Sequence, residues 1–306
     1  MLKGGHLLSF ADLTPDDVQE ILCLAHTLKQ QPEPNQRLLA GKTLAMIFEK
    51  PSTRTRVSFE VGMFQLGGNA INLAPGDIQM DGRETVPDVA RTLSRMVDGI
   101  LLRVYSHQTV QRFASASSVP VINGLSDFEH PCQALADLQT LQERVAHLSQ
   151  VTMAYVGDGN NVVHSLMFAA AKVDICLRVC TPKGFEPLPE VLARLNNLGQ
   201  HGAPRVELFN DPMAAVQGAN VIYTDVWTSM GQEAESKKRL KKFKGYQVNA
   251  ELLKRADPNC LVMHCLPAHR GEEISDEVLD GSQSIVFDQA ENRLHAQKAV
   301  LALLMG

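Results

Sequence analysis

The sequence predicts an α/β protein of two domains, each a parallel sheet flanked by helices. Its 306 residues suit two domains at roughly 100–200 residues each. Short apolar runs alternate with helical patterns, which is typical of parallel sheets covered on both faces. A polar stretch, His147-Leu148-Ser149-Gln150, interrupts this alternation near the middle of the chain. We therefore expect a first domain over 1–147 and a second over 148–288.

The composition excludes several classes of protein. Hydrophobic residues make up 44% and charged residues 21% of the chain, as in ordinary globular proteins and unlike disordered or fibrous ones. The net charge is −5, and the one conspicuous basic run, Lys237–Lys242, follows two glutamates. We therefore expect neither a nucleic acid nor a membrane as a partner.

The sequence carries no sign of secretion or membrane insertion. Apolar runs such as Val151–Val156 are far shorter than the ~20 residues that cross a bilayer, and the N-terminus reaches Asp12 without a sustained apolar segment. The six cysteines form no C-x-x-C pair and are too sparse for a disulfide framework. We expect a soluble, cytoplasmic protein.

The first half begins with a helix predicted from Pro15 to about Lys29. Thr14 can cap this helix, proline suits its first position, and acidic residues follow at the positive end of its dipole. The run Leu44–Phe48 then predicts a buried strand, and the next helical pattern ends at Gly67. Further helices are predicted over Thr85–Val97, Thr109–Ser115 and Pro131–Arg144, and strands over Gly99–Val104 and Val119–Ile122.

The second half repeats the alternation of strand and helix. Strands are predicted over Val151–Val156, Ile175–Cys180, Val206–Leu208, Val221–Thr224, Leu261–Met263 and Ser284–Phe287, and helices over Val162–Lys172, Pro189–Leu198, Pro212–Gln217 and Gln289–Met305. Polar motifs follow several of these strands, at the point where open α/β sheets bind ligands.

The motif Ser52-Thr53-Arg54-Thr55-Arg56 follows a predicted strand and opens a predicted helix. Free backbone N–H groups, the helix dipole, hydroxyls and arginines at one point favour an anion, so the motif predicts a phosphate site. It lacks the G-x-x-x-x-G-K-[ST] pattern, so no nucleotide-binding loop is implied. The alternative is a capped helix with solvated arginines.

A second motif, His130-Pro131-Cys132-Gln133, stands at the start of another predicted helix. The helix dipole lowers the pKa of a histidine at this position, and a neutral imidazole can donate a hydrogen bond to a carbonyl oxygen. Gln133 offers one more donor and one more acceptor. The alternative is a capped surface helix with a polar histidine.

Three motifs in the second half lie where a ligand could bind. His264-Cys265-Leu266-Pro267 follows a strand; its cysteine can be a nucleophile, a metal ligand or a pocket wall, and the ligand spacing argues against zinc. Asp225 precedes Ser229-Met230-Gly231 and can bind an ammonium group, unless it only caps a loop. Gly157-Asp158-Gly159-Asn160-Asn161 lacks the third glycine and the acid of a dinucleotide site, but Asn161 can hold a carboxylate.

The motifs together resemble the aspartate/ornithine carbamoyltransferase family. Phe48–Arg56, His130–Gln133 and His264–Pro267 match it in order and distance over nearly the whole chain, and Asp225 with Ser229-Met230-Gly231 resembles its ornithine branch. The resemblance implies an anabolic enzyme that transfers the carbamoyl group of carbamoyl phosphate to the δ-amine of L-ornithine, giving L-citrulline and phosphate in arginine biosynthesis. It also implies that the first domain binds carbamoyl phosphate and the second binds ornithine, with a closing helix over 289–306 that returns to the first domain.

The resemblance further assigns the site residues. Arg103 and His130 are expected to act on the carbonyl group, and Asp225 and Cys265 on the attacking amine; which of the latter two takes its proton stays open. Carbamoyl phosphate is expected to contact Ser52, Thr53, Arg54, Thr55, Gln79, Arg103, His130, Gln133, Cys265, Leu266 and Arg293, and ornithine to contact Asn161, Asp225, Ser229 and Met230. No metal and no organic cofactor is required.

The resemblance also implies a homotrimer with shared active sites. A loop over Ala74–Arg83, with Gln79, is expected to reach the phosphate of the neighbouring subunit. Other amines remain alternatives to ornithine: N-acetylornithine, putrescine and aspartate, the last of which Lys237–Lys242 would suit. A relative that binds phosphate without catalysis is a further alternative, but every polar residue that the chemistry needs is present.

Overall fold

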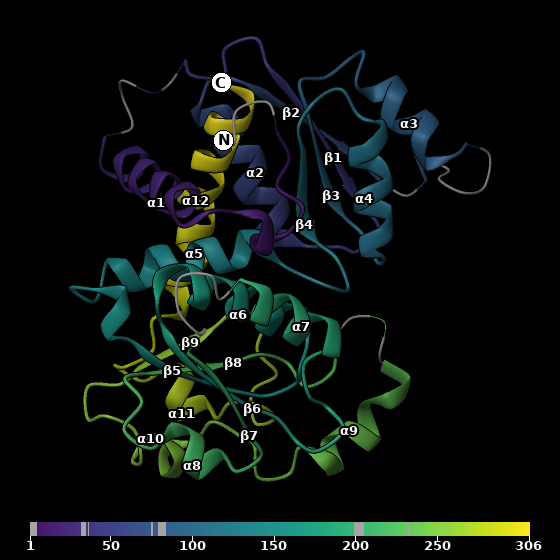
Figure 1. The fold of residues 1–306 in the computed structure, drawn as a ribbon. Helices are drawn as coiled ribbons and strands as arrows, with labels where there is room; N and C mark the ends of the chain where they lie inside the picture. The colour runs from purple at the N-terminus through teal and green to yellow at the C-terminus, as the bar shows by residue number, and fades with distance from the viewer. Residues whose placement is uncertain are drawn as a thin grey trace. The chain divides into compact units, whose positions relative to one another are not determined.

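We describe a computed structural model of the chain over residues 5–31, 35, 37–74, 76–78, 84–198, 205–229, 231 and 233–306. The chain divides into two compact units, Met1–Gln139 together with Glu291–Gly306, and Thr140–Ala290. Each unit contains one parallel sheet flanked by helices (Figure 1). The predicted fold class is therefore confirmed. Among the described residues, no helix is long and apolar enough to cross a membrane.

The first unit is built on a four-stranded sheet. Its strands are β1 (Thr43–Phe48), β2 (Asn69–Leu73), β3 (Gly99–Arg103) and β4 (Val121–Leu125), and its helices include the short η1 (Phe10–Asp12), α1 (Pro15–Gln30), α2 (Thr53–Gln65), α3 (Val86–Leu93), α4 (His107–Ala116) and α5 (Pro131–Gln142). The strand order is β2-β1-β3-β4. Helices α3 and α4 cover one face, where Val89 and Phe113 pack against Ile100 and Leu102. The predicted cap of α1 is confirmed, since Thr14 and Asp17 form a capping box.

The second unit is built on a five-stranded sheet in which Val156, Ile222 and Val262 contribute to the core. Its strands are β5 (Thr152–Val156), β6 (Cys176–Cys180), β7 (Val206–Phe209), β8 (Val221–Thr224) and β9 (Leu261–His264), in the order β7-β6-β5-β8-β9. Its helices are η3 (Leu148–Gln150), α6 (Asn161–Val173), α7 (Pro189–Asn197), α8 (Pro212–Val216), η4 (Glu233–Glu235), α9 (Ser236–Lys242), α10 (Ala250–Leu253) and α11 (Asp276–Leu279). Helices α8, α10 and α11 pack on the same apolar core.

The last helix, α12 (Val286–Met305), supplies its residues from Glu291 onward to the first unit. Lys29 Nζ donates to Asn292 Oδ1 at 2.9 Å, and Lys298 Nζ donates to the Leu28 carbonyl at 3.2 Å. The predicted return of the closing helix to the first domain is thus confirmed.

Two local predictions differ from the structure. The strand predicted over Ser284–Phe287 is wrong: Ser284 forms one bridge to Val262, and α12 begins at Val286. A short apolar run fits a buried helix start as well as a strand, and here the helix continues it. The strand β2 was not predicted, because it is only partly buried and has no continuous apolar run.

Candidate active site

The first unit exposes the start of α2 directly after β1. Ser52 caps this helix, since its Oγ accepts a hydrogen bond from the Thr55 N–H at 3.2 Å. Ser52 and the exposed Thr53 also line an open hollow of about 640 Å³. First-turn N–H groups have no acceptor within their own helix, and the dipole adds positive potential. The motif predicted to hold phosphate therefore lies at an accessible helix start that favours an anion.

Two arginines converge on the hydroxyl group of Thr55. Arg103 Nη1, at the end of β3, lies 3.4 Å from Thr55 Oγ1, and Arg293 Nη2, on α12, lies 3.1 Å from it. All three side chains are buried. Because Thr55 Oγ1 accepts from both arginines, its own O–H can donate to a ligand. Residues far apart in sequence thus present two cations and one hydroxyl donor at the same point.

Gln133, in the first turn of α5, has a fixed orientation. Arg293 Nη1 donates to Gln133 Oε1 at 2.8 Å, while Gln133 Nε2 donates to Asp137 Oδ1 at 2.8 Å. A guanidinium at one end of the amide and a carboxylate at the other determine which end is oxygen. Each end has capacity for one more hydrogen bond, so Gln133 can both accept from and donate to a ligand.

His130 directly precedes α5 and is buried. Burial, together with the nearby positive charges of Arg293, Arg103 and Arg54, holds the pKa of its imidazole well below the ordinary value. The ring is therefore neutral near physiological pH and can donate one N–H to a carbonyl oxygen. Next to it, burial raises the pKa of the Cys132 thiol to about 12, so this cysteine is not a nucleophile.

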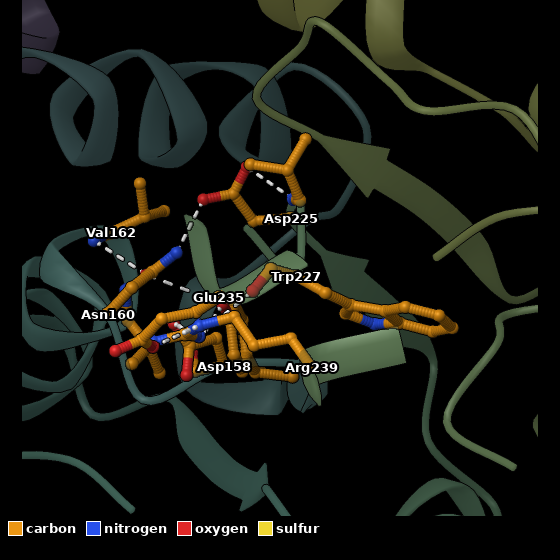
Figure 2. Close-up of polar contacts among 10 residues, drawn as sticks. Asp158, Asn160, Val162, Asp225, Trp227, Glu235 and Arg239 are labelled. Carbon is orange, nitrogen blue, oxygen red and sulfur yellow. Dashed lines mark hydrogen bonds and ion pairs between the residues drawn. The ribbon is translucent and has the colours of Figure 1, made fainter. Parts of the chain in front are cut away.

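In the second unit, the carboxylate of Asp225 follows the end of β8 and is buried. Asn160 Nδ2 donates to Asp225 Oδ2 at 2.7 Å, whereas Cys265 Sγ and the Val226 N–H donate to Oδ1 at 2.9 and 2.8 Å. The Asn160 amide is itself oriented, because its Oδ1 caps α6 by accepting from the Val162 N–H at 3.0 Å (Figure 2). A buried carboxylate in this position favours an ammonium group.

His264 orients the segment that follows β9. Its Nδ1 accepts from the Leu266 N–H at 2.8 Å, so Nε2 carries the ring hydrogen and donates to Glu273 Oε1 at 3.0 Å. This contact helps hold Leu266 at a φ of 55°, in the left-handed region that residues other than glycine avoid. The buried side chains of His264 and Glu273 thereby fix the backbone of Cys265 and Leu266.

Asp225, His264 and Cys265 place one possible metal-ligand atom each within 4.8 Å of one another. Zinc needs a lone pair from each ligand. Both ring nitrogens of His264 are already engaged, one as acceptor and one as donor. The three residues therefore do not offer a set of free donor atoms, and the arrangement does not fit a metal.

A buried ion pair beside this cluster was not predicted. Arg239, on α9, donates from Nη1 to Asp158 Oδ2 at 2.8 Å and to the Trp227 carbonyl at 2.9 Å (Figure 2). Burial raises the pKa of Asp158 to about 6, although the charge of Arg239 opposes that shift. Arg239 belongs to the run Lys237–Lys242, whose pattern indicates a solvated helix, so the sequence carried no signal for its burial.

The structure places the remaining predicted residues within the two units. Asn161 is the first residue of α6, next to Asn160, and Ser229 lies four residues beyond Asp225. Gln79 and Met230 lie outside the described residues, as does most of the predicted loop over Ala74–Arg83. Asn160 orients Asp225, and Asp137 orients Gln133. The sequence did not predict these two roles, because no motif marks a residue that acts through its neighbour.

Comparison with known proteins covers the whole chain. The family description "Aspartate/ornithine carbamoyltransferase, carbamoyl-P binding domain" matches residues 5–143, and "Aspartate/ornithine carbamoyltransferase, Asp/Orn binding domain" matches 149–304. An ornithine carbamoyltransferase of Thermococcus kodakarensis and an anabolic one of Pyrococcus furiosus are each 54% identical, over 100% of this chain and 98% of theirs.

Solved structures agree with these sequence matches. The ornithine carbamoyltransferase of Pyrococcus furiosus superposes with a TM-score of 0.96 at 54% identity, covering 100% of this chain and 98% of the other. That of Thermus thermophilus superposes with a TM-score of 0.89 at 47% identity, covering 98% and 99%. The similarity therefore extends over both units.

Proposed function

The chain belongs to the aspartate/ornithine carbamoyltransferase family, and we infer from its full-length relatives that it is an anabolic ornithine carbamoyltransferase. The reaction moves the carbamoyl group of carbamoyl phosphate to the δ-amine of L-ornithine. A carbon–nitrogen bond forms, the carbon–oxygen bond to phosphate breaks, and the amine loses a proton, giving L-citrulline and phosphate. One feature of the structure supports this chemistry most directly. The guanidinium groups of Arg103 and Arg293 both donate to the hydroxyl oxygen of Thr55.

The first unit supplies groups for the anionic substrate. We propose that Ser52, Thr53, Arg54 and Thr55 hold the phosphate at the start of α2, where N–H groups and the dipole favour it. Arg103 lies one hydrogen bond from Thr55, so its guanidinium can bridge phosphate and carbonyl oxygen. The departing phosphate is stabilised by the same groups, with Arg54 among them.

The carbonyl group reacts by way of a tetrahedral oxyanion. The neutral His130 ring, the Thr55 hydroxyl and Arg103 are the proposed donors to that oxygen, and they are fixed in place before the charge develops. Gln133 binds the carbamoyl nitrogen through the free lone pair of Oε1, and Arg293 holds Gln133 and faces the carbamoyl group. Preorganised donors of this kind lower the barrier because they need no rearrangement during the reaction.

The second unit supplies groups for the amino acid. We propose that the Asp225 carboxylate binds the α-ammonium group of ornithine, and that Asn161 and Ser229, with Met230, bind its α-carboxylate. Asn161 stands at the start of α6, where the dipole favours a carboxylate. Cys265 and Leu266 line the place where the δ-amine meets the carbonyl carbon, and their backbone is held by His264.

The hydrogen bond between Cys265 and Asp225 bears on the proton of the attacking amine. Asp225 Oδ1 accepts from Cys265 Sγ at 2.9 Å, so the sulfur is present as a thiol in this arrangement. A thiol that donates is neither a base nor a covalent nucleophile. We therefore propose that Asp225 is the acceptor of the amine proton and that Cys265 orients it.

We further propose a homotrimer whose active sites are shared, and a cytoplasmic location. The family membership supports the trimer, with Gln79 reaching the phosphate of a neighbouring subunit. The six free cysteines support a reducing compartment. Sedimentation of the active species tests the assembly: activity should migrate with the trimer, and an active monomer would contradict the shared site.

The function is tested by phosphate release and citrulline formation from carbamoyl phosphate with four amines offered separately. L-ornithine should give product, whereas N-acetyl-L-ornithine, L-aspartate and putrescine should not. Thr55→Val removes only the hydroxyl and should lower the rate with ornithine by ~10²-fold, while Thr27→Val, at an exposed threonine of α1, should leave it unchanged. Product with a different amine would overturn the assignment to ornithine but keep the phosphate site, and no product with any amine would overturn the activity.

A further inference from the structure

We propose that Arg239 is a positioning residue for the amino-acid substrate. Its guanidinium joins the two loops that carry the ornithine-binding groups, and it holds them at the spacing that ornithine requires. This inference rests on the proposed function, because it assigns a role within the same site. The proposed role is exerted through Asp158 and Trp227, which Arg239 binds.

Arg239 differs from the other cations around it. Helix α9 holds Lys237, Lys238, Lys241 and Lys242 at the surface, whereas the Arg239 side chain is only 8% exposed. Its guanidinium carbon lies 5.0 Å from the centre of the Phe185 ring, so an aromatic face packs against the charge. Burying an arginine without bound acceptors is costly, and here the acceptors are Asp158 and the carbonyl of Trp227.

Both acceptors belong to loops that bind substrate. Asp158 lies in the loop after β5, three residues before Asn161. Trp227 lies in the loop after β8, midway between Asp225 and Ser229. One nitrogen, Nη1, therefore binds both loops, at 2.8 and 2.9 Å (Figure 2).

A second contact links the same two loops. Asn160 Nδ2 donates to Asp225 Oδ2 at 2.7 Å, and Asn160 Oδ1 caps α6 (Figure 2). Asn160 thus joins the two loops at the Asp225 carboxylate, and Arg239 joins them through the Asp158 carboxylate and the Trp227 carbonyl. Without Arg239, the Asn160 contact and the hydrogen bond from Thr224 Oγ1 to the Val156 carbonyl would be left to hold the two loops together where they leave the sheet.

Charge makes Arg239 more than a steric support. Asp158 and Asp225 are two buried carboxylates whose negative charges repel, and Asp225 contributes to the raised pKa of Asp158. The positive charge of Arg239 offsets this repulsion and favours the ionised form of Asp158. Removal of the guanidinium therefore leaves a buried carboxyl group without its counter-ion, which drives the loop after β5 out of position.

The test compares Arg239→Lys and Arg239→Gln with wild type in the citrulline assay. The KM for ornithine should rise at least ~10-fold in Arg239→Gln, while the KM for carbamoyl phosphate should change less than about twofold. Arg239→Lys keeps the charge but not the planar fork, so it should recover part of the loss. A general weakening of the fold would change both KM values and would not be rescued by lysine.

A matched control is Arg178→Lys, at an arginine of the same unit that also donates to backbone carbonyls, those of Ala215 and Gln217. It should leave both KM values unchanged. Asp158→Asn should reproduce the ornithine effect, and combining it with Arg239→Gln should add little, because both variants remove the same ion pair. Fluorescence of Trp227, the single tryptophan of the chain, gives a second readout of ornithine binding at the contact itself.

The outcomes separate the two proposals. If wild type makes no citrulline, the proposed function fails. If wild type is active and Arg239→Gln binds ornithine as wild type does, by KM and by Trp227 fluorescence, the positioning role is overturned while the function stands. If Arg239→Gln does not fold, Arg239→Lys and Asp158→Asn test the positioning role instead. The role is contradicted if each of these variants changes the KM for ornithine and the KM for carbamoyl phosphate equally.

Discussion

The polar cluster of the first unit and that of the second are built with opposite charge. In the first unit, Arg54, Arg103 and Arg293 surround the imidazole of His130, and two of these arginines bind the same hydroxyl. In the second unit, the carboxyl groups of Asp158, Asp225 and Glu273 are buried, and one buried arginine, Arg239, binds both loops. The first cluster suits a phosphate and a developing oxyanion, and the second suits a substrate that arrives with ammonium groups.

The two clusters also differ in what holds them. The first rests on regular elements: the end of β3, the starts of α2 and α5, and the side of α12. The second rests on loops after β5, β8 and β9, tied by side-chain contacts from Asn160, Arg239 and His264. We expect substitutions in the first cluster to affect catalysis, and substitutions in the second to affect ornithine binding, with a further effect on kcat at Asp225 and Cys265, which we propose act on the attacking amine.

The largest effect is expected at Arg103. Arg103→Gln removes a cation that we propose faces the oxyanion and the phosphate, so kcat should fall by ~10³-fold. The KM for ornithine should change little, because the ornithine-binding groups lie in the other unit. Steady-state kinetics with each substrate varied in turn would measure both values.

Arg91→Gln is the control for this variant. Arg91 is exposed on α3, where it pairs with Asp88 at the surface, so its loss should not change kcat. An Arg103→Gln enzyme that kept kcat and instead lost ornithine binding would break the division between the clusters.

The second effect is expected at Asp225. Asp225→Asn keeps the shape but removes the charge that we propose binds the α-ammonium group and accepts the amine proton, so the KM for ornithine should rise ~10²-fold and kcat should fall as well. Carbamoyl phosphate binding, measured by calorimetry without ornithine, should be retained. Asp211→Asn is a matched control, since Asp211 caps α8 and asparagine caps equally well; loss of carbamoyl phosphate binding in Asp225→Asn alone would contradict the assignment.

The sequence predicted the first cluster better than the second. Ser52 and Thr55 stand three residues apart at a helix start, and local capping and dipole rules are enough to predict an anion site there. Arg293 was assigned by family resemblance alone, because a helical pattern does not say which surface the helix packs on. Arg239 was missed, because burial of one cation in a basic run depends on acceptors from two distant loops.

A third effect, smaller than these, is expected at Cys265. Cys265→Ala removes one of the donors to the Asp225 carboxylate, and kcat should fall by roughly tenfold near neutral pH. The loss should persist at high pH if, as we propose, the thiol orients Asp225 and does not carry the proton. Cys23→Ala, at an exposed cysteine of α1, is the control. Complete loss of activity in Cys265→Ala would indicate a direct role for the sulfur, and recovery at high pH would indicate a proton-transfer role for it.

The smallest effect concerns the pH dependence of stability and arises from His130. Its pKa is well below 6.5 in the folded protein, because of burial and three arginines, and is ordinary in the unfolded chain. The unfolded chain therefore binds more protons as pH falls below 6.5, so the neutral ring stabilises the fold above that pH and the contribution is lost on acidification.

The free energy of unfolding should therefore fall between pH 7.5 and pH 5.5. His130→Asn removes the titration, so its urea midpoint, followed by circular dichroism, should fall less over that range than the wild-type midpoint. His147→Asn, at an exposed histidine, should show the wild-type pH dependence. If the urea midpoints of wild type and His130→Asn depended equally on pH, the imidazole would not be held neutral. The first cluster would then lack a neutral hydrogen-bond donor, and this donor is what distinguishes it from a simple phosphate site.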